Sequence, residues 1–290
     1  MKRWLCLLLA CLILLLAGCS AVPGKPVDSS AGSQSAATQE HEKTGLPELT
    51  VTVLDLGKAD SILIQMENHA GLIDTGKDGD GADILAVLKD KGIQKLDFLL
   101  LTHLDKDHIG GADKILAAMP VGRLLQSNND EDSGDYKEYL QACDEKKITP
   151  EKLKETQTVI LSGAEFRFLP AKRDYYEDDN DYSVLTELTY GEKRFLFAGD
   201  AEDERLEEYL AQDVLPFDFL KVPHHGRKSE LSAAFLQAVS PKSAVITCSK
   251  KKQPDDEIII LLTQLGARVF LTSDGYVTAR CDGKDLKVSQ

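Results

Sequence analysis

The chain has 290 residues, of which 42% are hydrophobic and 28% are charged, and its formal net charge is −14. This composition is typical of a globular protein and excludes collagen-like and strongly disordered classes. An acidic balance argues against tight, non-specific binding to nucleic acid, which depends on Lys and Arg, but it is compatible with a local basic patch. Three of the six cysteines lie in the first 19 residues, and the other three cannot form a complete disulfide framework.

The N-terminal residues have the layout of a secretory signal. A basic pair, Lys2-Arg3, precedes an apolar run over residues 4–16 that is too short for a comfortable membrane span. The sequence Leu16-Ala17-Gly18-Cys19 resembles a bacterial lipobox, which implies cleavage before Cys19 and lipidation of its thiol. We expect residues 1–18 to be a lipoprotein signal peptide that places the protein on the extracytoplasmic face of the cell membrane, with an uncleaved signal anchor as the alternative.

Residues 19–48 are rich in Ser, Ala, Gln, Gly and Pro and have no apolar periodicity, so we expect a flexible tether. The remaining residues, 49–290, alternate between short apolar runs and segments with helical apolar spacing, which predicts an α/β domain. Strands are expected at residues 49–54, 96–101, 122–127, 244–248, 268–271 and 276–280, with hairpins over 159–169 and before Asp200. Helices are expected at residues 83–91, 112–119, 136–147, 201–210, 231–239 and 257–265.

A cluster of metal-ligand residues follows the expected strand at residues 96–101. His103, Asp105, Asp107 and His108 fall within six residues, directly before Gly110-Gly111. Burying two imidazoles and two carboxylates is costly unless a partner compensates them, and a metal ion does so most directly. An α/β fold also places its sites at the carboxyl ends of strands. The pattern therefore predicts a metal site.

The spacing H-x-D-x-D-H resembles the H-x-H-x-D-H signature of the metallo-β-lactamase superfamily, with Asp105 in place of the second histidine. This variant is similar to the hydrolase domain of the ComEC competence proteins and their free-standing relatives. Further likenesses run from Leu49 to Val288. They include Asp55, Gly57 and Asp60 in a D-V-G-Q-G-D-A-like turn, Asp74 in GLIDTG, Asn180, Asp181 and Ser183 in an N-D-N-S-like segment, Asp200 in FAGD, and His224-His225 in LKVPHHG. The resemblance implies a four-layer αββα sandwich.

The resemblance also implies a site with two divalent metal ions, Zn²⁺ or Mn²⁺. It assigns His103 and Asp105 to one ion, and Asp107 with His224 or His225 to the other. His108 lies beside Asp107, and Asp200 bridges the ions, so that Asp107 and Asp200 carry the catalytic site. The sequence leaves the choice between His224 and His225 open, with His225 favoured. Asp74 and Asp55 are expected to support the ligands without binding metal.

One histidine ligand of many superfamily members has no counterpart, because no histidine occurs between residues 109 and 223. An oxygen donor from Asp181, Asp179 or Asn180 could replace it. Asp105 in place of an imidazole makes the ligand set harder and moves the balance from Zn²⁺ towards Mn²⁺.

The implied activity is hydrolysis by a water that paired metal ions activate. A phosphodiester substrate, with DNA as one candidate, is favoured, and Lys221, Arg227 and Lys228 beside the histidine pair are candidate phosphate-binding residues. Two alternatives remain. One is hydrolysis of a small or wall-linked phosphodiester such as a choline phosphate or a nucleotide, and the other is a lipid-anchored binding module with a decayed site. The sequence does not indicate an oligomeric state.

Overall fold

The computed structural model describes residues 45–290, which all belong to one compact unit. The expected signal peptide, the lipidation site Cys19 and nearly all of the expected tether lie outside the described residues. Between residues 45 and 290, no helix has both the length and the apolar composition that a bilayer span requires.

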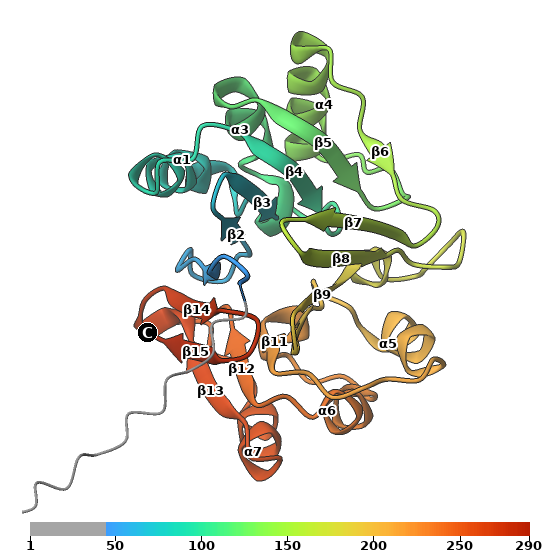
Figure 1. Cartoon of the computed structure of the whole chain (residues 1–290). Coiled ribbons are helices and arrows are strands. Elements are labelled where there is room, and N and C mark those ends of the chain that lie inside the picture. Colours follow the sequence, from blue (N-terminus) through green and yellow to red (C-terminus); the bar gives the residue numbers. More distant parts are fainter. Residues whose placement is uncertain (1–44) are drawn as a thin grey trace, which may run out of the picture. The chain divides into compact units, whose positions relative to one another are not determined.

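Two mixed β-sheets form the centre of the unit (Figure 1). In spatial order, the first sheet contains β15 (Leu286–Ser289), β14 (Val277–Cys281), β1 (Leu49–Val53), β2 (Ile62–Met66), β3 (His69–Ile73), β4 (Leu96–Leu101), β5 (Val121–Gln126) and β6 (Glu151–Lys152). The second contains β13 (Arg268–Leu271), β12 (Ser243–Ile246), β11 (Phe219–Lys221), β10 (Lys193–Phe197), β9 (Leu185–Tyr190), β8 (Ala164–Leu169) and β7 (Gln157–Leu161). Strands β3 to β6 and β10 to β13 are parallel, and the other neighbours are antiparallel.

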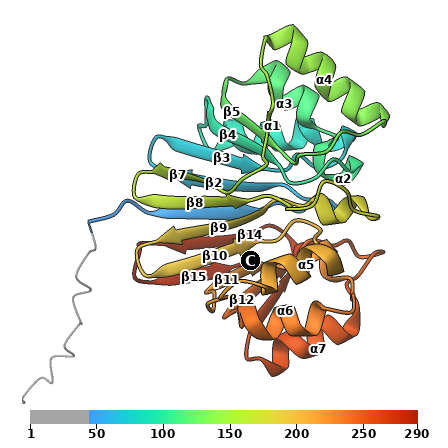
Figure 2. The same cartoon turned by 90° about the vertical axis from the view of Figure 1, so that its right-hand side faces the viewer.

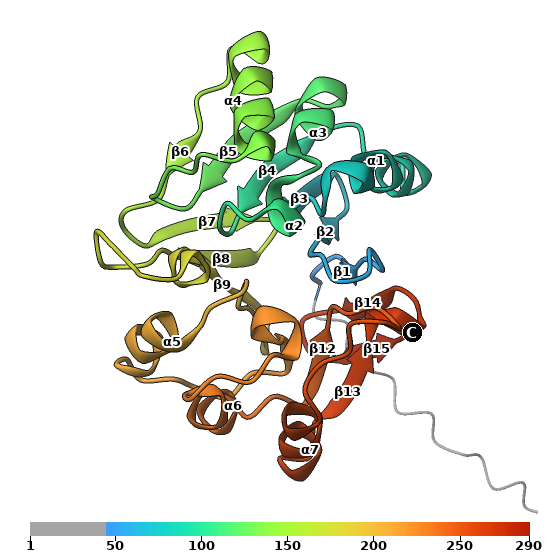
Figure 3. The same cartoon turned by 180° about the vertical axis from the view of Figure 1, so that it is seen from behind.

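Helices cover the outer face of each sheet (Figures 2 and 3). The first sheet carries α1 (Gly81–Asp90), α2 (Lys106–Ile109), α3 (Ala112–Ala118) and α4 (Gly134–Lys146), and the second carries α5 (Asp203–Leu210), α6 (Ser232–Val239) and α7 (Asp256–Gln264). The predicted four-layer αββα sandwich is therefore confirmed. Among the elements that were not predicted are the single-turn helix α2, the strand β6 and the closing strand β15, because each has four residues or fewer and shows no usable periodicity.

Apolar side chains fill the three interfaces between the four layers. Strand β4 shows how: Phe98 and Leu100 face the other sheet, while Leu99 and Leu101 pack under the helices of the first layer. Side chains of a strand point alternately to its two faces, so a strand buried on both faces needs the continuous apolar run seen here. A Cβ added at Gly71 would lie 2.2 Å from the Phe98 ring, so the neighbouring strand must carry glycine at this position.

The topology gathers the candidate site at one edge of the two sheets. The parallel pairing of β3 with β4 places Asp74 beside the start of the His103 segment. Three neighbouring parallel strands end at this edge: β10 ends before Asp200, β11 before the histidine pair, and β12 before Thr247. The loop between β1 and β2 reaches the same edge, where the hydroxyl of Thr247 donates to Asp60 at 2.6 Å.

Candidate metal centre

The two histidines of the H-x-D-x-D-H segment are fully buried, with ring centroids 4.0 Å apart. His108 lies in α2, and its Nδ1 donates to a carboxylate oxygen of Asp74 at 2.8 Å. Asp74 also accepts from the backbone N–H and the hydroxyl of Thr102, both at 2.8 Å, and this fixes the carboxylate. Nδ1 of His103 lies 3.2 Å from the same hydroxyl. Asp74 therefore supports the two histidines, as expected for a residue behind the ligands.

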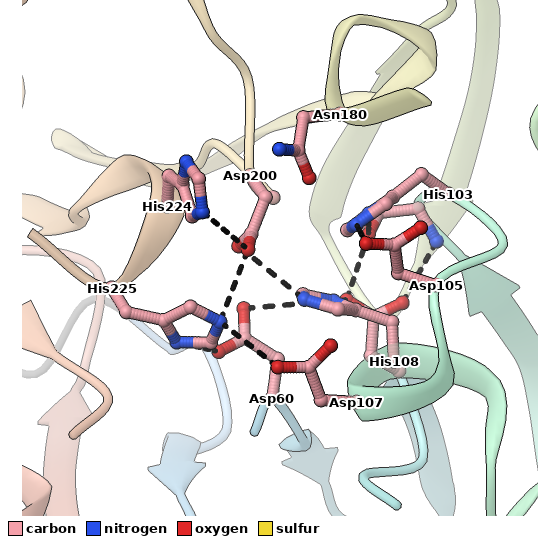
Figure 4. A network of polar contacts seen from close by, with 12 residues as sticks. Asp60, His103, Asp105, Asp107, His108, Asn180, Asp200, His224 and His225 are labelled. Carbon is pink, nitrogen blue, oxygen red and sulfur yellow. Dashed lines mark hydrogen bonds and ion pairs between the residues drawn. The ribbon is translucent and has the colours of Figure 1, made fainter. Parts of the chain in front are cut away.

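The histidine pair lies in a strained turn. His224 and His225 have φ values of +43° and +53°, and Gly226 follows at +75°, so three successive residues adopt the left-handed region. This conformation is costly for residues other than glycine, and it is found mainly where function requires it. It brings both imidazoles towards Asp200, although they are neighbours in the chain (Figure 4).

Only one histidine of the pair, His225, has its Nδ1 held by the backbone and its Nε2 directed at the carboxylates of the site. Nδ1 of His225 donates to the backbone carbonyl of Thr247 at 3.1 Å, and its Nε2 lies 3.0 Å from Asp200 and 3.7 Å from Asp107. His224 contacts the carboxylate of Glu202 through Nδ1, and its Nε2 is 4.0 Å from Asp200. The geometry favours His225 as the ligand, with His224 beside it.

Asp200 is the centre of the cluster (Figure 4). Its two carboxylate oxygens face Nε2 of His108 at 3.3 Å and Nε2 of His225 at 3.0 Å. Asp107 has a largely buried side chain, whereas Asp105 is 45% exposed and lies 4.0 Å from Nε2 of His103. All seven residues that the sequence analysis assigned to the metals are therefore brought together.

The donor set fits metal ions. Protein groups contact Nδ1 of His103, His108 and His225, and in each of these residues Nε2 is buried and makes no hydrogen bond to the described part of the chain. Buried polar atoms without a partner are rare in proteins, and an imidazole fixed through one nitrogen is the usual form of a metal ligand. Three groups of donor atoms in the described residues each lie within 4.8 Å of one another: His103, His108 and Asp200; Asp60, Asp200 and His225; and Asp60, Asp74 and His108.

A sequence model of the metallo-beta-lactamase superfamily matches residues 54–250, which is more than half of the chain. The chain belongs to this superfamily. Among solved structures, it is similar to the metallo-beta-lactamase fold protein YhfI from Bacillus subtilis, with a TM-score of 0.53 and 12% identity over 83% of this chain and 100% of that one. It also resembles a variant of the CmlA beta-hydroxylase, with a TM-score of 0.54 and 16% identity over 81% of this chain and 54% of that one. These similarities support the fold.

Curated relatives of this metallo-beta-lactamase domain include ComE operon protein 3 of Bacillus subtilis (strain 168), which is 28% identical over 77% of this chain and 31% of that protein. Competence protein ComA of Neisseria gonorrhoeae is 29% identical over 68% of this chain and 27% of that protein. The resemblance to competence proteins is thus confirmed. The chain spans about a third or less of the length of these relatives.

In this metallo-beta-lactamase domain, Lys221 does not have the role proposed from the sequence. Its side chain is completely buried, and its ammonium group contacts the carboxylate of Asp60 and lies 3.3 Å from Asp200. Nζ also donates to the carbonyl of Gly199 at 2.9 Å. A lysine enclosed in this way cannot reach a substrate phosphate, so its assignment to phosphate binding is wrong.

Two carboxylates also differ from their predicted roles. Asp55 is exposed and accepts from the backbone N–H of Gly57 at 3.4 Å, so it shapes the loop, while Asp60 in the same motif is buried under the site. Asp181 accepts from the backbone N–H groups of Glu202 and Arg205 at 2.9 and 3.1 Å, which ties it to the start of α5. Figure 4 instead shows Asn180 beside Asp200. Asp60 matched the family motif in sequence, but nothing in the sequence indicated its contact with Lys221.

The charges of the site affect one another strongly. Burial alone would raise the pKa of Asp200, but His225, His108 and Lys221 outweigh it and hold this pKa well below its usual value. Burial would lower the pKa of His108, and the carboxylates of Asp200 and Asp74 instead raise it well above its usual value. Burial dominates at His103 and lowers its pKa. A neutral His103 and an ionised Asp200 favour metal binding, whereas a charged His108 must lose a proton before its Nε2 can bind a metal ion.

Proposed function

We propose that this chain is a metal-dependent phosphodiesterase. The observation that carries the proposal is the set of three buried Nε2 atoms of His103, His108 and His225, which make no hydrogen bond within the described residues and lie around the carboxylate of Asp200. Together with Asp105 and Asp107, these residues would hold the metal ions. Paired divalent ions, when bound, lower the pKa of a water towards about 7 and neutralise charge on phosphoryl oxygens.

The protein's own groups prepare the site for this reaction. Asp74 and Thr247 fix the imidazoles of His108 and His225 in the tautomer that leaves Nε2 available. Lys58 lies 3.6 Å from Asp107 and is 27% exposed, so it adds positive charge next to the ligands where a substrate can reach it. Asp105 presents oxygen donors at the open side of the site, which supports Mn²⁺ as the activating ion.

The names of the relatives support a nucleic-acid substrate. One relative is a competence protein, and another is Recombination protein 2 of Haemophilus influenzae, 29% identical over 70% of this chain and 25% of that protein. Because this chain spans only part of these proteins, their whole activities are not transferred, and our proposal is limited to cleavage of the phosphodiester bond.

A substrate panel tests the proposal. The chain loaded with Mn²⁺ is expected to cleave bis-p-nitrophenyl phosphate, to cleave single-stranded DNA more slowly, and to leave nitrocefin almost intact. Asp107→Ala should abolish cleavage, because it removes a metal ligand. Hydrolysis of nitrocefin without phosphodiester cleavage would contradict the proposal, and so would nuclease activity that survives Asp107→Ala. Preference for a choline phosphate or nucleotide ester in the panel would favour the small-substrate alternative.

We further propose that the protein acts at the cell surface through a lipid anchor on Cys19. The support is the lipobox-like sequence Leu16-Ala17-Gly18-Cys19 after an apolar segment. Stable anchoring requires more than one acyl chain, as in bacterial lipoproteins. Cys19→Ala is expected to release the protein from the membrane fraction or to block its maturation. An unmodified Cys19 thiol in a membrane-bound parent protein would contradict this proposal.

A further inference from the structure

A cleft of about 390 Å³ opens beside the candidate metal centre. It is lined by Lys58, His224, His225, Arg227, Lys251, Lys252, Gln253 and Asp255. Four of these side chains are cationic and one is a carboxylate, in a chain whose formal net charge is −14. We call it the basic cleft. A concentration of positive charge against an acidic background marks a binding site for an anion.

Three separate segments form the walls of the basic cleft. Lys58 comes from the loop between β1 and β2, Arg227 follows the histidine pair, and Lys251-Lys252 lie in the turn after β12. Hydrogen bonds beneath the cleft connect the segments, because Thr247 donates to Asp60 at 2.6 Å and accepts from His225. The walls are therefore already in place.

The lysine turn is held by its own hydrogen bonds. The backbone N–H of Lys252 donates to the carbonyl of Ser249 at 3.1 Å, and the side-chain amide of Gln253 donates to the same carbonyl at 2.7 Å. The turn also packs against the histidine segment, since a Cβ added at Gly226 would lie 2.6 Å from Pro254. The position of the two lysines is thus linked to that of the candidate ligand His225.

The cations of the basic cleft are available to a ligand. Within residues 45–290, no carboxylate pairs with the side chains of Arg227, Lys251 or Lys252, and all three residues are exposed. The neighbouring Lys250 instead pairs with Asp274, and Lys228 pairs with Glu257. The carboxylate of Asp255 accepts from the backbone N–H of Lys228 at 2.8 Å. Three cations at the cleft therefore have no internal counterion.

The other side of His224 has the opposite character. A second hollow there is lined by the carboxylates of Asp178, Glu202, Asp203 and Glu230, together with Arg227 and Lys228. A polyanion is repelled from this hollow and attracted to the basic cleft. The metal centre thus has a side suited to phosphates and a side that disfavours them.

We propose that the basic cleft binds a phosphate group next to the phosphodiester that is cleaved, so that the substrate is a single-stranded nucleic acid with several phosphates. This inference rests on the proposed phosphodiesterase function and specifies its substrate class. Lys58, Arg227, Lys251 and Lys252 contact the flanking phosphate, while the unpartnered Nε2 of His225 marks the metal centre at the end of the cleft. Binding through these cations is independent of base sequence and sensitive to salt.

Binding of a fluorescent single-stranded oligonucleotide to the metal-free full chain in EDTA tests the inference without requiring cleavage. The cleft variant carries Lys251→Gln with Lys252→Gln. The matched control carries Lys284→Gln with Lys287→Gln, which removes the same charge from exposed positions in or near β15. The control positions lie away from the metal centre. Gly283, beside Lys284, contacts Gly191 in the turn before β10, and Asp200 follows the other end of β10.

The cleft variant is expected to bind about fivefold more weakly at 0.1 M salt, and the slope of log K against log salt should fall by about 0.7, since the loss of one phosphate contact on a single strand contributes about 0.7. The control should match the parent chain. Equal binding by all three chains, equal weakening in both variants, or no binding by the parent would overturn the inference. Absence of cleavage by the Mn²⁺-loaded parent would count against the phosphodiesterase and would leave this binding comparison intact.

Discussion

The ammonium group of Lys221 lies 3.3 Å from a carboxylate oxygen of Asp200, and both side chains are almost completely removed from solvent. The same ammonium group contacts Asp60, so one lysine compensates two carboxylates beneath the candidate metal centre. Burial would lower the pKa of Lys221, but Asp60 and Asp200 outweigh it and raise this pKa above its usual value. Lys221 therefore remains charged and acts as a structural cation of the site.

Lys221→Met should destabilise the metal-free protein by about 3–5 kcal/mol, because it removes the buried cation that compensates the carboxylates of Asp60 and Asp200. Urea unfolding in EDTA at pH 7 measures the change. Lys250→Met is the matched control, since Lys250 and its partner Asp274 are 71% and 55% exposed and such a pair contributes about 0–1 kcal/mol. Equal, small losses in the two variants would show that the buried contact has little energetic value.

The two neighbouring histidines should differ in metal binding. His225→Ala removes a nitrogen that lies 3.0 Å from Asp200, so the affinity for Mn²⁺ or Zn²⁺ should fall by more than the roughly 10- to 100-fold that loss of a supporting group costs. His224→Ala should leave the affinity within about threefold, because its ring contacts Glu202 instead. Isothermal titration of the metal-free chains gives both values, and the reverse order would assign the metal to His224.

Asp74→Asn should weaken metal binding by about 10- to 100-fold without removing a ligand, because Asp74 orients His108 through its Nδ1. The same titration measures this effect. Asp78→Asn, at a carboxylate that is 64% exposed, serves as the control and should bind metal like the parent. Unchanged affinity in Asp74→Asn would mean that the hydrogen bond does not determine the orientation of the imidazole.

Asp181 offers a test of pH dependence. Burial raises the pKa of its carboxyl group from 3.8 to about 6. Ionisation of this group therefore destabilises the folded protein, and the free energy of unfolding decreases progressively as the pH rises from about 4 to above 6. Asp181→Asn keeps an oxygen that accepts from the backbone of α5 and removes the charge. Relative to the parent, this variant should gain about 1 kcal/mol in unfolding free energy between pH 5 and pH 7.5. Urea unfolding at both values measures the difference, and a relative loss at pH 7.5 would contradict it.

The sequence predicts well what depends on local pattern. The continuous apolar run of β4 and the ligand cluster after it were sufficient to place His103 and His108 at a strand end, and the spacing of the cluster pointed to the family. The contact between Lys221 and Asp60 could not be predicted, since the two residues are 161 positions apart in the sequence and meet only where the two sheets pack against each other. From the sequence alone, Lys221 beside the histidine pair was interpreted as an accessible cation, and only the fold shows that it is buried.

The roles of His225 and Asp181 were beyond the sequence for a related reason. The choice between two adjacent histidines depends on a left-handed turn and on Thr247 at the end of another strand, and neither has a local signature. Asp181 fits the family motif, but its two hydrogen bonds to the start of α5 are a product of tertiary packing.

The metal content of the purified protein tests the central claim most directly. Elemental analysis of the native chain should find about two Mn²⁺ or Zn²⁺ ions per molecule, and Asp200→Ala should reduce this number sharply, because Asp200 lies between His108 and His225. A content near zero in the parent chain, with no binding after addition of either ion, would contradict the account.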